Sequence, residues 1–135
     1  MFGLINLYKP PGVTSRDCVN AISKNLRTRK VGHAGTLDPI AEGVLVVAVG
    51  QATRLIEYVQ QQPKTYRGVF RLGCDSPSYD IETALTYVEG PLPELETLQL
   101  ACAKHVGRIQ QVPPVFSAVK VRGQRAYDLA RQGQA

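Results

Sequence analysis

One carboxylate lies in the glycine-rich stretch 32–39, which comes shortly before an apolar run over residues 44–49. Asp38 follows Gly32 and Gly35 and stands immediately before Pro39. Because glycine and proline permit or restrict particular backbone conformations, they can hold such a segment in one non-repetitive shape. A carboxylate held in that way can act as a nucleophile, a general base or a ligand, or it can merely cap its own turn. Asp38 is therefore the first candidate for a chemical role.

The residues around Asp38 exclude several common kinds of site. Asp38 is the only acid in the stretch 32–39, so the paired carboxylates of a glycosidase are not indicated there. His33 could be a base, an RNA contact or a hydrogen-bonding residue of the loop, but no serine or cysteine nucleophile motif accompanies it. Neither a P-loop nor a G-x-G-x-x-G pattern is present, so binding of a nucleoside triphosphate is not expected.

Composition indicates a single globular domain, or part of one, with a basic surface. The chain has 135 residues, of which 44% are hydrophobic, a net charge of +5 and a pI near 9.3. This balance favours a polyanionic partner without proving one. The three cysteines are widely spaced and form no C-x-x-C pair, which predicts neither a disulfide framework nor a zinc site and favours a cytosolic setting. No apolar run is long enough to span a bilayer, and the N-terminal run is expected to be a strand and not a signal peptide.

Hydrophobic periodicity predicts strands and helices in alternation. The expected strands cover residues 2–7, 44–49, 64–72 and 115–121, and the expected helices cover 15–26, 52–60, 95–105 and 125–131, with Thr14 or Ser15 as the first helix cap. The run at 44–49 is expected to be buried. This order predicts an α+β fold with a mixed sheet.

Aromatic and cationic side chains form two further candidate groups. Tyr66 is flanked by cations, including Arg67, on an expected strand, where it could stack on an unpaired base or simply pack in the core. Arg29 and Lys30 follow the first helix and are expected beside the Asp38 segment. The proline-containing stretch 110–125 could grip a nucleic acid or form an ordinary hairpin.

Several ordered blocks of the sequence resemble the bacterial TruB family of tRNA pseudouridine synthases. These blocks are GLINLYKPPGVTS (3–15), GHAGTLDP (32–39), GVL (43–45), KTYR (64–67), LG (72–73), QVPPVFSAVKV (111–121) and RAY (125–127). The resemblance implies the family's α+β fold, a largely antiparallel sheet with flanking helices. It also implies that residues 1–135 are a part of the catalytic domain, that residues from about 107 to 135 form an RNA-gripping insertion, and that the C-terminal half is absent.

The same resemblance implies an enzyme that converts the T-loop uridine at tRNA position 55 to pseudouridine. Asp38 matches the essential aspartate that attacks the target nucleoside, and Tyr66 matches the active-site tyrosine that packs against the target base. His33 matches the histidine that contacts RNA. The RNA-binding set expected in this way is His33, Gly35, Thr36, Arg67, Lys120, Arg29 and Lys30. The resemblance implies no metal and no organic cofactor, a cytoplasmic protein without a membrane partner that is monomeric at full length, and the tRNA T-arm stem-loop as partner.

The chain also departs from the family pattern. Tyr8 stands where the family usually has an aspartate, and Glu42 where a small hydroxyl residue is common. The stretch 74–83 is altered, although Asp80 still matches. Two alternatives stay open: a non-catalytic RNA-binding fragment of such an enzyme, and a relative of the guide-RNA-dependent pseudouridine synthases.

Overall fold

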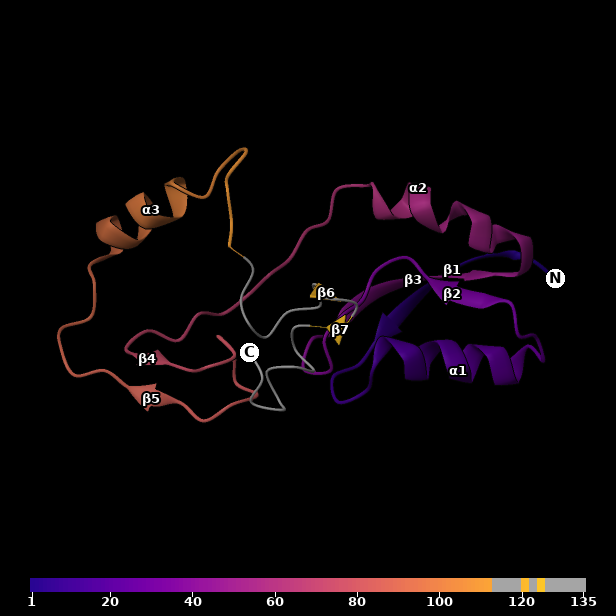
Figure 1. Cartoon of the computed structure of the whole chain (residues 1–135), viewed down its shortest axis with the longest axis horizontal. Coiled ribbons are helices and arrows are strands. Elements are labelled where there is room, and N and C mark those ends of the chain that lie inside the picture. The colour runs from indigo at the N-terminus through magenta and orange to yellow at the C-terminus, as the bar shows by residue number, and fades with distance from the viewer. Residues whose placement is uncertain (113–119, 122–123, 126–135) are drawn as a thin grey trace. The chain divides into compact units, whose positions relative to one another are not determined.

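The chain divides into two compact units, Met1–Tyr66 and Arg67–Ala135 (Figure 1). The structure is a computed structural model that describes residues 1–112, 120–121 and 124–125. Within these ranges no helix is long and apolar enough to cross a membrane. Most of the expected strand 115–121 and nearly all of the expected helix 125–131 lie outside the described residues. What is described there is a short antiparallel pair, β6 (Lys120–Val121) with β7 (Gln124–Arg125).

The first unit is built on an antiparallel sheet in the order β1-β3-β2. Its strands are β1 (Gly3–Lys9), β2 (Val31–His33) and β3 (Gly43–Val49). The register places Lys9 opposite Gly43 at one end of the sheet and Gly3 opposite Val49 at the other. The sequence predicted β1 and β3. It did not predict β2, which is too short to show an alternating pattern.

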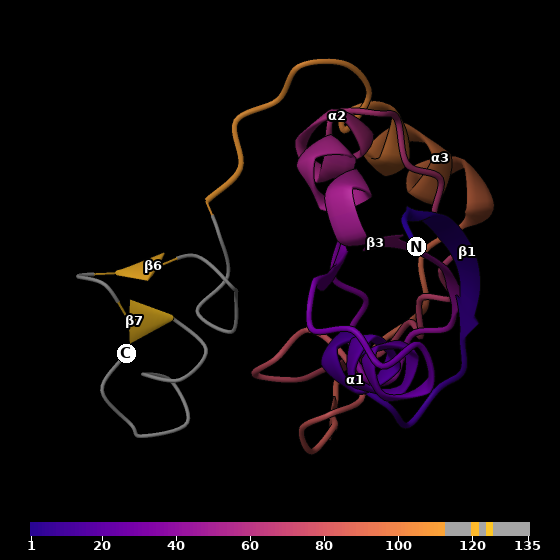
Figure 2. The same cartoon turned by 90° about the vertical axis from the view of Figure 1, so that its right-hand side faces the viewer.

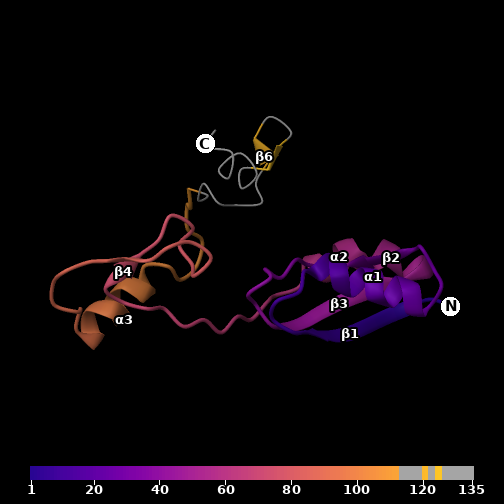
Figure 3. The ribbon, with the colours of Figure 1, turned by 90° about the horizontal axis from the view of Figure 1, so that it is seen from below.

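One face of this sheet packs against helix α1 (Ser15–Asn25), as the views in Figures 2 and 3 show. The core joins two residues of α1, Cys18 and Val19, to Leu45 and Val47 of β3. Alternate residues of a strand share a face, so the inward positions of β3 meet the apolar stripe of the helix. The side chain of Val47 has no exposed surface. This burial supplies the main hydrophobic stabilisation of the unit.

The opposite face of the sheet is covered at one end by η1 (Gly50–Leu55) and α2 (Ile56–Gln60), where a single helix over 52–60 was expected. Gly32 allows this packing, because a Cβ there would lie 2.8 Å from Cδ1 of Ile56. Val44 is 64% exposed at the other end, so the prediction of a wholly buried run over 44–49 was wrong there. Nothing in the described part of the chain covers that position.

The second unit contains a short antiparallel pair, β4 (Cys74–Asp75) with β5 (Thr86–Tyr87), and helix α3 (Leu95–Ala103). The guanidinium of Arg71 lies 5.3 Å from the ring centroid of Tyr87, within the range of a cation–π contact. Helix α3 confirms the helix expected over 95–105, ending two residues earlier. The strand predicted over 64–72 was wrong: these residues are irregular and exposed, since no neighbouring strand in the described ranges takes up their backbone hydrogen bonds.

A capping box starts helix α1 and makes a pH-dependent contribution to stability. Thr14 is the N-cap, its hydroxyl accepts from the backbone N–H of Asp17, and the Asp17 carboxylate accepts from the Thr14 hydroxyl and backbone N–H. The hydrogen bond from the Thr14 side chain, followed by that from its backbone, lowers the pKa of Asp17 below its usual 3.8.

We expect the Asp17→Asn variant to be less stable than the parent near neutral pH and equally stable in acid. The depressed pKa means that the contribution of Asp17 is fully present above about pH 4 and is lost as the pH falls through the folded-state pKa. Urea denaturation of both proteins between about pH 6 and about pH 2 measures the difference. A difference that stays constant over this range would contradict the expectation.

Candidate active site

Asp38 lies in the segment 34–42 that connects β2 to β3. The segment is tied to the sheet at its start by the N–H of Ala34, which donates to the carbonyl of Val46 at 2.9 Å. It closes on itself where the N–H of Ala41 donates to the carbonyl of Asp38 at 3.0 Å. The side chain of Asp38 is exposed and has no hydrogen-bond or ion-pair partner among the residues that the structure describes. Its carboxylate therefore faces solvent from a closed turn.

The residue before Asp38 is held by the start of helix α1. The Oγ of Ser15 accepts from the N–H of Leu37 at 2.9 Å and donates to the carbonyl of Leu37 at 3.1 Å. Ser15 is only 2% exposed, so water does not compete freely for these hydrogen bonds. The first residue of α1 and the Asp38 segment are thus joined directly.

The residue after Asp38 is held by the turn between β1 and α1. The carbonyl of Pro39 accepts from the N–H of Gly12 at 2.8 Å and from Nζ of Lys9 at 3.4 Å. Gly12 has φ of +84°, a left-handed conformation that residues with a Cβ adopt at a cost. Gly12 therefore lets the turn present its N–H to Pro39, and Asp38 lies between two anchored neighbours.

The side chain of Lys9 connects the turn after β1 to the Asp38 segment. This side chain is fully buried, and its Nζ also donates to the carbonyls of Pro10 at 2.9 Å and Val13 at 2.8 Å. A lysine is rarely buried unless its donors are satisfied, and here three carbonyls satisfy them. The sequence assigned Lys9 no role of its own. The only signal was its place before two prolines and a glycine.

A further hydrogen bond links the end of the segment to β1. The phenol of Tyr8 donates to Oε2 of Glu42 at 2.6 Å, so two residues that depart from the family pattern pair with each other. This hydrogen bond and the nearby negative charge raise the pKa of the Tyr8 phenol above its usual 10.0. Both side chains are exposed, so we attribute little stability to the pair.

His33 stands at the end of β2 and is partly buried. Its Nδ1 lies 2.7 Å from the carbonyl of Gly35, and because a carbonyl only accepts, Nδ1 carries the proton. In the neutral ring Nε2 is then left as an acceptor. The hydrogen bond holds the imidazole over the first residues of the Asp38 segment, in which Gly35 and Thr36 also lie.

The structure does not gather the other predicted residues around Asp38. The carbonyl of Lys30 accepts from the N–H of Gly50, so Lys30 lies at the end of β3 where that strand finishes. The Asp38 segment lies at the other end, where β3 begins. Seven residues of strand separate these ends by about 20 Å, so the expectation that Arg29 and Lys30 lie beside the Asp38 segment was wrong. Tyr66 is 72% exposed, and no described hydrogen bond or ring contact joins it to Asp38.

Arg67 belongs to the second unit and is exposed. Lys120 lies in the short strand β6. The expected insertion over 107–135 lies mostly outside the described residues.

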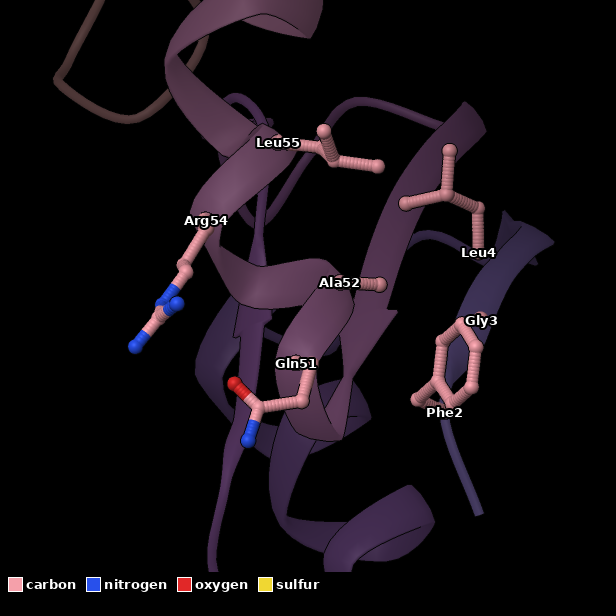
Figure 4. Close-up of a pocket in the computed structure, with 7 residues that line it drawn as sticks. All are labelled: Phe2, Gly3, Leu4, Gln51, Ala52, Arg54 and Leu55. Carbon is pink, nitrogen blue, oxygen red and sulfur yellow. The ribbon is translucent and has the colours of Figure 1, made fainter.

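A shallow apolar pocket of about 330 Å³ lies at the end of the sheet opposite Asp38 (Figure 4). Leu4 and Leu55 point toward each other across it, whereas Gln51 and Arg54 point away. The pocket offers no group suited to acid, base or nucleophilic chemistry. Among the described residues no cluster of three or more histidine, cysteine, aspartate or glutamate side chains is suited to hold a metal ion.

Residues 23–135 match the profile of the TruB family pseudouridylate synthase N-terminal domain. The chain belongs to the TruB family. This TruB chain is 46% identical over 136 residues to the tRNA pseudouridine synthase B of Microcystis aeruginosa and 47% identical over 135 residues to that of Thermosipho melanesiensis. The alignments cover 99% of the chain but only 46% and 44% of those relatives. The chain therefore spans less than half the length of the curated relatives that it matches.

A solved structure of the same fold is the crystal structure of a Cbf5-Nop10-Gar1 complex. It is 36% identical to the TruB chain with a TM-score of 0.57, over 90% of this chain and 32% of that one. The likeness confirms the expected α+β fold class, and the described strand pairs are all antiparallel.

Replacing Lys9 by methionine should destabilise the first unit. The variant keeps the volume of the side chain but leaves the carbonyls of Pro10 and Val13 without this donor, at a cost of about 2–3 kcal/mol in the free energy of unfolding. Urea denaturation measures the loss. The exposed Lys24→Met is the matched control and should change stability by less than about 0.5 kcal/mol. Equal effects of the two substitutions would contradict the role assigned to Lys9.

Proposed function

We propose that this chain supplies the Asp38-bearing part of an enzyme that isomerises the T-loop uridine at tRNA position 55 to pseudouridine. Membership of the TruB family and the names of the curated relatives support pseudouridine synthesis on tRNA. The observation that carries the proposal is Asp38 itself: an exposed carboxylate whose two neighbours, Leu37 and Pro39, are anchored by hydrogen bonds. A group fixed in this way reaches a substrate without reorganising its backbone.

In the proposed reaction the Asp38 carboxylate acts as the nucleophile and forms a transient covalent bond to the target nucleoside. That bond breaks again before the product leaves, which regenerates the free carboxylate. The bond between C1′ of the ribose and N1 of uracil breaks, the base turns, and a new bond forms between C1′ and C5. The C5 proton then leaves to solvent and N1 is protonated, so atoms and electrons balance without a redox partner or phosphoryl donor. The proposal therefore requires no metal and no organic cofactor.

The other residues are proposed to bind the RNA or the flipped base. His33, with its Nε2 free to accept, and the adjoining Gly35 and Thr36 border the segment that carries Asp38. A target base must leave its stack to reach Asp38, which costs a few kcal/mol and calls for a stacking surface. We assign that surface to the ring of Tyr66, and phosphate contacts to Arg67 and Lys120.

Arg29 and Lys30 are proposed to contact RNA away from the reacting nucleotide. They lie about 20 Å from the end of the sheet that carries Asp38. Lys30 donates to the side chain of Gln51 at 3.3 Å, and neither cation has an ion-pair partner among the described residues. Exposed cations at that distance, without an ion-pair partner among those residues, suit the phosphate backbone of the T-arm and not the target base.

The names of three curated relatives, which are 45–47% identical over nearly the whole chain, favour tRNA as the substrate. We infer a cytoplasmic enzyme that acts on the T-arm stem-loop as a monomer.

An Asp38→Asn variant should lose isomerisation while it still binds the RNA. Release of tritium from C5 of the target uridine in a T-arm stem-loop measures turnover, and we expect a loss of at least about 1,000-fold because the amide is no nucleophile. Filter binding of the same RNA should change less than about 3-fold. Asp17→Asn, an exposed aspartate of the capping box, is the control and should retain turnover. Release by Asp38→Asn at the parental rate would overturn the assignment, and binding without release by the parent would favour the RNA-binding alternative.

Removing both distal cations should weaken RNA binding without selectively slowing the chemical step. A plot of the log of the RNA-binding constant against log salt concentration has a negative slope. In the Arg29→Ala, Lys30→Ala double variant this slope should become shallower by about 1.5, because two phosphate contacts are lost. Lys104→Ala, an exposed cation at the end of α3, serves as the control and should leave the slope unchanged. An unchanged slope in the double variant would contradict the contact.

A further inference from the structure

Ser15 touches both polar groups of the residue that precedes Asp38. Its hydroxyl accepts from the N–H of Leu37 and donates to the Leu37 carbonyl, at 2.9 Å and 3.1 Å. That carbonyl belongs to the peptide group that joins Leu37 to Asp38. A hydrogen bond to it restrains the orientation of this peptide plane, and so the direction in which the Asp38 side chain leaves the backbone.

The Ser15 hydroxyl is not needed to cap the helix that it begins. Thr14 is the N-cap, and the reciprocal bonds between Thr14 and Asp17 complete the capping box. A serine hydroxyl in the first turn of a helix ordinarily bonds to the local backbone or to water. In this chain it reaches across 22 positions of sequence to the Asp38 segment and is 2% exposed.

The other flank of Asp38 is anchored by different groups. The carbonyl of Pro39 accepts from Lys9, the last residue of β1, and from Gly12 in the turn that follows. With Pro39 held from one element and Leu37 from another, the backbone of Asp38 is restrained on both sides. Removing the Ser15 hydroxyl would release one side and leave the other in place.

We propose that Ser15 is a positioning residue that orients Asp38 for nucleophilic attack. The proposal rests on the function proposed above, and Ser15 itself does not touch the RNA. A displacement of about 1 Å at a reacting group can cost about 100-fold in rate. Loss of the Ser15 hydroxyl should therefore slow the chemical step while RNA affinity is retained.

The experiment compares the parent with Ser15→Ala, Ser15→Thr and Ser23→Ala in the intact protein. Ser23 is the matched control, because its hydroxyl donates to the carbonyl of Thr28 at the far end of the same helix. Single-turnover tritium release should fall about 10- to 100-fold in Ser15→Ala, with Kd for the T-arm stem-loop changed less than about 3-fold. Ser15→Thr, which keeps the Oγ, should recover most of the rate, and Ser23→Ala should keep the parental rate.

Amide hydrogen exchange gives a readout that does not depend on turnover. The N–H of Leu37 loses its acceptor in Ser15→Ala, so its exchange should accelerate, and that of Leu26, which donates to Ile22, should not. If Ser15→Ala does not fold, Ser15→Cys replaces it, because a thiol fills a similar volume with weaker hydrogen bonds.

The two readouts separate the two proposals. A parental rate in folded Ser15→Ala, or a loss confined to Kd, would overturn the positioning role. A rate loss in Ser23→Ala equal to that in Ser15→Ala would do the same, since it would indicate general destabilisation. A parent that binds the stem-loop without tritium release would favour the RNA-binding alternative over the proposed function. Exchange at Leu37 would then test whether Ser15 holds the segment: unchanged exchange overturns that role and faster exchange supports it.

Discussion

The buried side chain of Lys9 is the interaction on which the geometry of the first unit depends. One nitrogen bonds to carbonyls of Pro10, Val13 and Pro39, which belong to two segments far apart in the sequence. Burying a lysine is costly unless each of its donors finds an acceptor. The turn after β1 and the Asp38 segment must therefore both be in place for Lys9 to be buried, and this ties their folding together.

The hydrophobic core gives these hydrogen bonds a rigid base. Leu45 and Val47 of β3 pack against Cys18 and Val19 of α1, and this packing fixes the position of the helix on the sheet. Ser15 begins that helix, and Gly43, just after the Asp38 segment, begins that strand. A close-packed core resists displacement of either element. The position of Asp38 is thus a consequence of core packing as well as of the local hydrogen bonds.

Tyr8 and Glu42, which were expected to depart from the family pattern, bond to each other next to this site. They lie at neighbouring ends of β1 and the Asp38 segment, and they form a hydrogen bond of 2.6 Å. This exposed pair adds little stability, so the segment is held mainly by the buried Lys9 and Ser15.

The sequence by itself determined the elements with strong local signals, namely β1, β3, α1 and α3, and it singled out Asp38 from its glycines and proline. Local patterns sufficed there because periodicity, caps and turn residues act over a few positions. Only the tertiary structure decided which groups support Asp38. The bonds of Lys9 to Pro39 and of Ser15 to Leu37 span 30 and 22 positions, and no local pattern encodes them. The same reason explains the errors over residues 64–72 and over Arg29 and Lys30, since strand partners and the end of a sheet at which a residue lies are set by long-range pairing.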